Sequence, residues 1–144
     1  MDDVTFKIND AICVLSMFDI KSIDWEYKPS AGKWSKKEIL GHLIDSALVN
    51  LQRFIRCTYE ENFKLTYDQV AWVKAQRYQM ANVKDLLHLW RLLNDQIIAV
   101  LKNYPAERLF AQCDTGKTAV SLHTVEWLVN DYEDHLRHHL KQII

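Results

Sequence analysis

The sequence predicts an all-α protein, a four-helix bundle, and three observations lead to this prediction. Only three glycines and two prolines interrupt the 144 residues, and runs that alternate apolar and polar residues are almost absent. Both observations favour long helices joined by modest loops. Four segments also carry apolar residues at helical spacing, which is the pattern of helices that bury one face against each other.

The first two long helices are expected over residues 4–23 and 35–59. The first has an apolar face made of Ile8, Ala11, Ile12, Leu15 and Phe18. The second opens at Ser35, which forms a capping box with Glu38: the hydroxyl and the carboxylate each satisfy a free backbone amide. Gly41 lies inside this helix, where glycine costs about 1 kcal/mol relative to alanine. We therefore expect another group to pack closely against Gly41.

The connection that follows has a weaker pattern, over residues 60–81. A short additional helix over residues 67–79 is expected to carry Trp72 and Tyr78. Aromatic side chains in this segment could line a substrate cavity, although filling of the core is the more frequent role of such residues.

The last two long helices are expected between Asn82 and Pro105 and over residues 121–143. Asn82 is a favourable cap, and Pro105 cannot continue a helix. The long connection before Asn82 permits an up-down-down-up order of the four helices instead of simple up-down alternation.

Composition and charge narrow the class of protein. The chain is expected to form one domain over residues 1–144, and its 49% hydrophobic and 26% charged residues are typical of a globular protein. A net charge of -1 gives no electrostatic reason for binding nucleic acid or an anionic membrane. We find neither a signal peptide nor an apolar stretch long enough to span a bilayer. Three isolated cysteines indicate reduced thiols in a cytoplasmic protein.

Three of the six histidines lie close to the carboxyl end, and two explanations are open. His135 and His139 are about 40° apart on a helix and flank its apolar stripe. Histidines interact favourably with the carboxyl end of a helix dipole, which is the ordinary explanation. A metal site is the alternative, because side chains four residues apart project from the same side. His138 points away from this pair and is expected at the surface.

A metal site would need a third ligand from another helix, and His42 is the candidate. The helical wheel places His42 among polar side chains, nearly opposite the apolar face, so the pattern alone predicts exposure to solvent. His42 becomes a ligand only if that polar strip lines a cleft between the second and fourth long helices. His88 and His123 have no histidine partner at helical spacing and are expected to be surface or structural residues.

Two stretches of the chain resemble the DinB/YfiT-like family of metalloenzymes, the DinB superfamily. They are KWSKKEILGHLID, residues 33–45, and the terminal HLRHHLKQI, residues 135–143; the central Tyr67-x-x-x-x-Trp72-Val73-x-x-Gln76-x-Tyr78 is similar to one branch of the family. The resemblance implies an up-down-down-up bundle, commonly dimeric. It also implies a metal site with one ligand from the second helix and two from a His-x-x-x-His on the last, which here are His42, His135 and His139.

Three neutral imidazoles suit zinc, nickel or iron(II) and leave a coordination position open. The leading functional hypothesis is an enzyme that transfers a low-molecular-weight thiol to an electrophilic small molecule, as some relatives do. Hydrolysis by metal-activated water is a second hypothesis, and a non-enzymatic, stress-related dimeric bundle is a third. Asp131, Glu38 and Asp45 are possible acceptors for the imidazole N–H groups. We also expect a homodimer, because the second helix carries more apolar surface than one bundle obviously buries.

Overall fold

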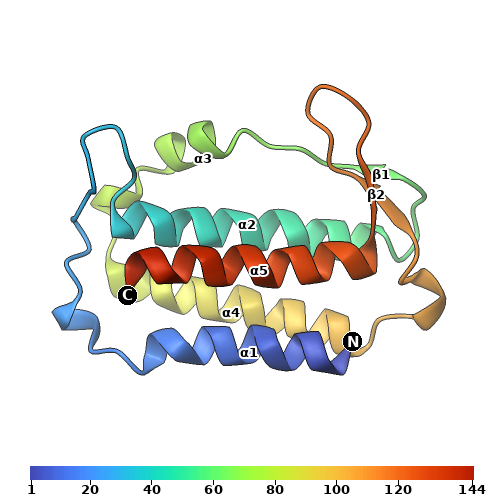
Figure 1. Ribbon diagram of the computed structural model, residues 1–144, viewed down its shortest axis with the longest axis horizontal. Coiled ribbons are helices and arrows are strands. Elements are labelled where there is room, and N and C mark those ends of the chain that lie inside the picture. The colour runs from blue at the N-terminus through green and yellow to red at the C-terminus, as the bar shows by residue number, and fades with distance from the viewer.

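Four long helices lie side by side in the computed structural model, which describes residues 1–144 (Figure 1). They are α1 (Asp2–Ser16), α2 (Lys36–Arg56), α4 (Val83–Lys102) and α5 (Val125–Ile143). The shorter α3 (Gln69–Gln76) and three 3-10 turns, at Ile20–Ser22, Tyr78–Met80 and Ala106–Arg108, lie in the connections. The predicted bundle of four amphipathic helices is therefore confirmed. No helix has both the length and the apolar character that crossing a membrane requires.

The predicted helices differ from the observed ones mainly at their ends. α1 ends at Ser16 and not near residue 23, because the Asp19 side chain accepts a hydrogen bond from the Lys21 amide and starts a separate 3-10 turn. The short helix predicted over residues 67–79 is α3, which stops at Gln76 because Arg77 adopts the left-handed conformation, with φ 48°.

A small three-stranded sheet was not predicted from the sequence. It consists of β1 (Phe63–Lys64), β2 (Gln112–Asp114) and β3 (Leu122–Thr124); β1 is parallel to β2, and β2 is antiparallel to β3. Strands of two or three residues are too short to show a period of two in the sequence. As a result α5 begins at Val125 and not at residue 121, and the sheet ties the start of α5 to the segment that follows α2.

The hydrophobic core lies between the four long helices and forms one cluster of 28 buried residues. Its most deeply buried large side chains come from all four helices and include Ile8, Leu40, Leu43, Phe54, Ile97, Leu101 and Leu136. One polar contact crosses this core: the Tyr132 hydroxyl donates to Asn94 Oδ1 over 2.6 Å. Burial of the apolar faces is thus the main source of stability, as is usual for helices packed in a bundle.

The segment between α2 and α4 packs directly onto Gly41 of α2. A Cβ atom at Gly41 would lie 2.1 to 2.4 Å from three ring atoms of Tyr78. The expected close approach at this glycine is therefore confirmed, and the group is an aromatic ring. The Tyr78 hydroxyl donates to Asp45 Oδ1 over 2.6 Å, and Gln76 Nε2 donates to the same oxygen over 2.7 Å. These contacts hold the α3 region over the first half of α2.

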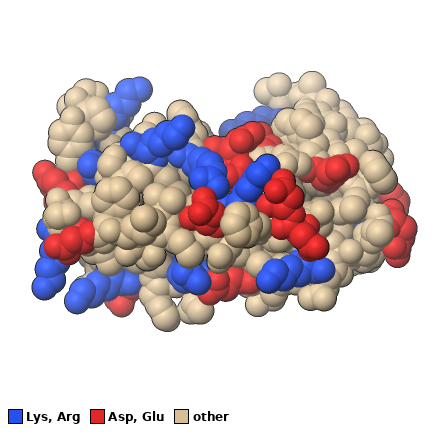
Figure 2. Space-filling view, turned by 60° about the horizontal axis from the view of Figure 1, so that its bottom comes forward, with Lys and Arg blue, Asp and Glu red and all other residues tan.

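The surface has mixed charge on the face shown in Figure 2. Lysine and arginine side chains alternate there with aspartate and glutamate, and neither sign forms a large continuous patch. The three cysteines, Cys13, Cys57 and Cys113, are all free.

Candidate metal centre

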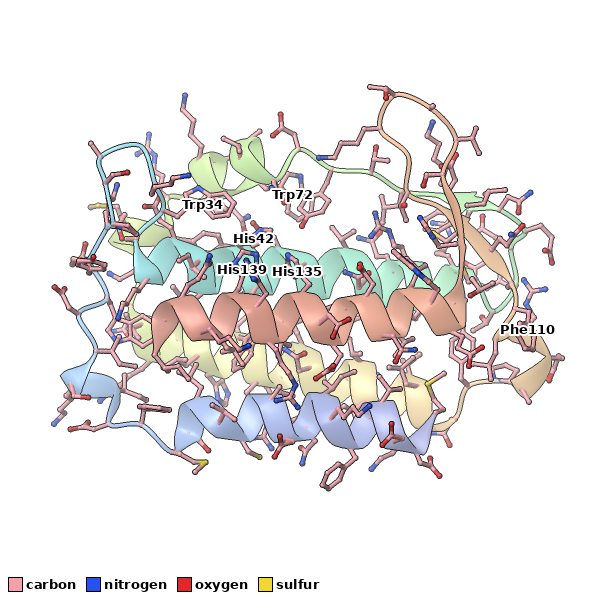
Figure 3. The ribbon with its side chains drawn as sticks, viewed as in Figure 1. Trp34, His42, Trp72, Phe110, His135 and His139 are labelled. Carbon is pink, nitrogen blue, oxygen red and sulfur yellow. The ribbon has the colours of Figure 1, made fainter.

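The three histidines implied as ligands converge between α2 and α5 (Figure 3). His42 lies near the start of α2, and His135 and His139 lie in the second half of α5. The Nε2 atoms of His42 and His135 are 3.1 Å apart, and the three side chains offer nitrogen atoms that all lie within 4.8 Å of one another. The fold therefore brings together side chains that are more than ninety residues apart in the sequence.

His42 is buried, contrary to the exposure that the helical pattern alone predicts. Only 1% of its surface is accessible, because α5 packs along the polar strip of α2. The apolar strip of α2 faces the core, where Leu40 and Leu43 are fully enclosed. Both faces of the first half of α2 are thus covered within one chain, and the polar face forms the cleft that a third ligand requires.

The hydrogen bonds of the cluster define which nitrogen atoms are free. His139 Nδ1 lies 2.7 Å from Gln142 Oε1, one turn further along α5. An amide oxygen only accepts hydrogen bonds, so the proton resides on Nδ1 and the lone pair of His139 Nε2 is left available. The Nδ1 atoms of His42 and His135 are buried without a partner. Their Nε2 atoms are the ones that face each other.

This donor set fits a divalent transition metal. In a tetrahedral site with metal–nitrogen bonds of about 2.0–2.1 Å, two ligand nitrogens are about 3.3 Å apart. The separation of His42 Nε2 and His135 Nε2 is 3.1 Å, and the nitrogen atoms of all three side chains lie within 4.8 Å of one another. Two neutral imidazoles at this distance can share one hydrogen bond at most, whereas both lone pairs can point at one ion.

The electrostatic environment keeps the three imidazoles neutral. Burial, and then the neighbouring His135 and His139, lower the pKa of His42 from 6.5 to about 3. Burial is also the main reason that the pKa of His135 is lowered to about 4 and that the pKa of His139 is lowered. Neutral imidazole is the form that binds metals, so this environment favours the protonation state that the cluster needs for binding.

An aromatic ring that the sequence analysis did not single out covers the centre. The Trp34 ring lies 4.9 Å from that of His42, centroid to centroid, and Trp34 and Trp72 both lie on the side of the histidines that faces α3 (Figure 3). The position of Trp34 follows from the predicted capping box, which is confirmed: Glu38 N donates to Ser35 Oγ, and Ser35 N donates to Glu38 Oε1. The cap sets the start of α2 and thereby places Trp34 next to His42.

The acceptors suggested for the imidazole N–H groups have other roles. Glu38 caps α2 and pairs with Lys28, and Asp45 accepts from Tyr78 and Gln76. Asp131 is exposed. Gln142 is the partner that sequence reasoning missed. Its position three residues after His139, on the same face of a helix, was the signal that could have identified it.

The remaining histidines lie outside the cluster, as expected. His138 and His88 are exposed. His123 stacks on Trp127, with ring centroids 3.8 Å apart, and its Nε2 lies 3.1 Å from Ser121 Oγ. His123 therefore has a structural environment, and His138, although adjacent to His139, does not face His42.

A bundle of long helices with three convergent imidazoles defines a class of helical proteins with a candidate metal centre. The family model of the DinB superfamily matches residues 20–143, and the chain belongs to this superfamily. The structure is similar to that of YfiT from Bacillus subtilis, described as "a probable metal-dependent hydrolase with an unusual four-helix bundle topology": the TM-score is 0.75 at 23% identity, over 98% of this chain and 78% of YfiT. A DinB-like protein of Bacillus subtilis, YjoA, is similar with a TM-score of 0.61 at 15% identity, over 98% of this chain and 87% of that one. The comparison with curated proteins gave no significant match.

Proposed function

We propose that the protein is a metal-dependent enzyme in which His42, His135 and His139 hold a divalent transition metal. The observation that carries this proposal is the convergence of three neutral imidazoles from two helices, with all donor nitrogens within 4.8 Å. The ligand set suits zinc, nickel or iron(II).

We infer that the reaction is transfer of a low-molecular-weight thiol to an electrophilic small molecule. A metal bound by three neutral ligands lowers the pKa of a thiol or water in its open position and so supplies a nucleophile near neutral pH. Gln142 holds the Nδ1 proton of His139 and keeps the Nε2 lone pair free. Trp34 shields His42 from solvent. A cavity of about 200 Å³ beside His139 gives room for a small organic reactant next to the centre.

Hydrolysis is the second candidate function. The specific observation in its favour is the structural similarity to YfiT, which is described as a metal-dependent hydrolase. The same centre would then activate water, so the two candidates differ in the nucleophile and share the ligands.

The experiment begins with metal analysis of the purified protein and of the variants His42→Ala, His135→Ala and His139→Ala. Each variant is expected to lose most of the bound metal while its circular dichroism stays helical, because the apolar faces dominate stability. A screen of electrophiles with several thiols then separates the functions. Turnover only with thiol supports transfer, and turnover without thiol supports hydrolysis. Wild-type metal affinity in the His42 variant would refute the shared centre and the enzyme with it, leaving the non-enzymatic bundle.

We further infer that residues 1–144 form one domain with its helices in up-down-down-up order. In support, α1 and α5 run toward the same end of the bundle in Figure 1, and α2 and α4 run the opposite way. The hydroxyl of Tyr104, just after α4, donates to the carbonyl of Phe54, near the end of α2, over 2.7 Å. Three free cysteines favour a cytoplasmic location.

We also propose a homodimer. Two large apolar side chains three residues apart on α4 are exposed: Leu89 is 44% exposed and Leu92 52%. Exposed apolar surface of this kind favours association with a second copy. Light scattering at micromolar concentration tests the proposal, and a monomeric mass would contradict it.

A further inference from the structure

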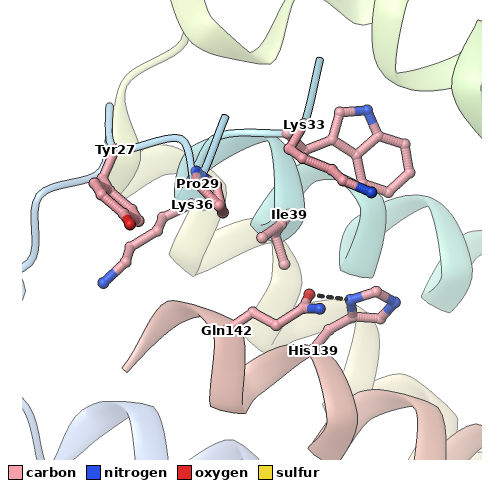
Figure 4. A pocket seen from close by; sticks show the side chains of 8 residues that line it. Tyr27, Pro29, Lys33, Lys36, Ile39, His139 and Gln142 are labelled. Atoms are coloured by element: carbon pink, nitrogen blue, oxygen red, sulfur yellow. Dashed lines mark hydrogen bonds between the residues drawn. The ribbon is translucent and has the colours of Figure 1, made fainter. Parts of the chain in front are cut away.

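A pocket of about 200 Å³ opens beside the candidate metal centre (Figure 4). One wall is formed by the segment that precedes α2 and by its first turn, with Tyr27, Trp34 and Ile39. The opposite wall is the last part of α5, where His139 and Gln142 lie side by side. Because His139 belongs to both, a molecule in this pocket lies directly next to the three histidines.

Two lysines that form no ion pair give the pocket a positive charge. Lys33 and Lys36 both line it, on two sides of the cavity in Figure 4. Neither takes part in any of the ion pairs of the protein, whereas their neighbours Lys28 and Lys37 pair with Glu38 and Glu26.

No carboxylate lines the pocket itself. Asp24 lines an adjoining hollow that shares Tyr27 and Lys36, and it forms no ion pair with Lys36. Lys36 instead lies 5.7 Å above the Tyr27 ring. Both ammonium groups therefore remain available to a ligand.

The polar and apolar groups that line the pocket indicate the chemistry of the molecule that it can bind. The rings of Tyr27 and Trp34 offer flat apolar surface, and the two lysines offer donors at its edge. The Oε1 atom of Gln142 is already engaged by His139, whereas its Nε2 donor forms no hydrogen bond within the chain. A ligand with a small apolar body and one anionic group complements the aromatic rings and the donor groups of this lining.

We propose that this pocket binds the substrate as a small organic anion, with a carboxylate or phosphate group attracted by the positive charges of Lys33 and Lys36 and the reacting end placed beside His139. The assignment of this molecule as the substrate rests on the proposed function. Binding of the anion to the pocket does not, because the lysines and aromatic rings are present without a metal.

The test is a calorimetric titration of the metal-free protein with benzoate and with benzamide, which have the same shape and differ in charge. Benzoate is expected to bind about tenfold more tightly, since exposed ion pairs contribute only a few-fold each. Lys33→Gln and Lys36→Gln should each weaken benzoate binding roughly threefold, and the double variant roughly tenfold, with benzamide unaffected. Raising the salt concentration should weaken benzoate binding alone. Phenyl phosphate in place of benzoate identifies which anionic group is preferred.

Lys117→Gln is the matched control, because Lys117, like Lys33, is exposed and forms no ion pair, but it lies in the β2–β3 connection and does not line the pocket. It should leave benzoate binding unchanged. Equal binding of benzoate and benzamide, no binding of either at millimolar concentration, or the same loss in the Lys117 variant would each overturn the proposal. Because the protein is free of metal in these titrations, their outcome is independent of the metal analysis. The pocket can bind anions even if the three histidines bind no metal, and the histidines can bind metal even if the pocket binds no anion.

Discussion

Replacement of Gly41 by alanine should destabilise the protein, although alanine is the better helix former. By intrinsic propensity alone, the substitution in the interior of α2 would stabilise by about 1 kcal/mol. The new methyl group would, however, lie 2.1 Å from the Tyr78 ring, far inside ordinary contact distance. Overpacking of this kind costs about 1–3 kcal/mol.

Displacement of the ring has a second consequence at Asp45. This carboxylate is fully buried, its Oδ2 has no partner, and its Oδ1 accepts from Tyr78 and Gln76. If the Tyr78 hydroxyl moves away, Asp45 retains a single donor, and loss of a bond to a buried group costs about 1–3 kcal/mol. A gain of about 1 kcal/mol and two costs of about 1–3 kcal/mol each predict a net destabilisation of about 1–5 kcal/mol for Gly41→Ala.

The assay is urea unfolding followed by circular dichroism, in a double-mutant cycle with Tyr78→Ala. Removal of the ring leaves room for the methyl group, so Gly41→Ala in the Tyr78→Ala background should stabilise by up to about 1 kcal/mol. The sign of the effect should therefore reverse between the two backgrounds. A stabilising Gly41→Ala in the wild-type protein, or the same effect in both backgrounds, would refute the reasoning.

Three further predictions concern the histidine cluster. The His138→Ala variant should retain most of the bound metal, because the His138 side chain is exposed and points away from His42. The His139→Ala variant should lose the metal. Equal loss of metal in the two variants, measured by metal titration, would show that His139 is the wrong member of the pair. Unfolding of the metal-free protein should become easier as pH falls below 6.5. In the folded protein the pKa values of His42 and His135 are about 3 and about 4, below the pKa of 6.5 that a histidine has in the unfolded chain. The unfolded state therefore binds more protons. The free energy of unfolding should fall by about 1.4 kcal/mol per pH unit for each imidazole. Denaturant midpoints that stay level from pH 7 to pH 5 would contradict this. Gln142→Leu should weaken metal binding about 10- to 100-fold, because His139 Nδ1 loses its hydrogen-bond acceptor. Gln142→Glu keeps an acceptor and should bind metal with an affinity close to that of the wild-type protein. Wild-type affinity in the Gln142→Leu variant would show that Gln142 does not orient His139.

Local features of the fold were readable from the sequence because their causes lie within a few residues. The capping box of Ser35 and Glu38, the cap at Asn82 and the apolar faces of the four long helices depend on neighbours one turn away, and all are present in the structure. The ends of α1 and α3 were predicted less well. There, Asp19 and Arg77 start new local conformations that compete with continuation of the helix.

The site was only partly determined by the sequence. The spacing of His135 and His139 follows from helical geometry, and the resemblance to the DinB superfamily pointed to His42. Whether His42 lies in water or under another helix is decided by the packing of α5 against α2, since burial is a property of the contact between helices and not of either pattern.

Only the tertiary structure revealed the contacts between distant segments. Tyr78 on Gly41, the parallel pairing of β1 with β2 and the pocket between residues 27–39 and the end of α5 each join parts of the chain that no local period connects. A glycine, a two-residue strand or an unpaired lysine has the same appearance in the sequence whatever lies opposite it. Long-range packing determines which group lies opposite such a residue, and therefore which structural or functional role the residue has.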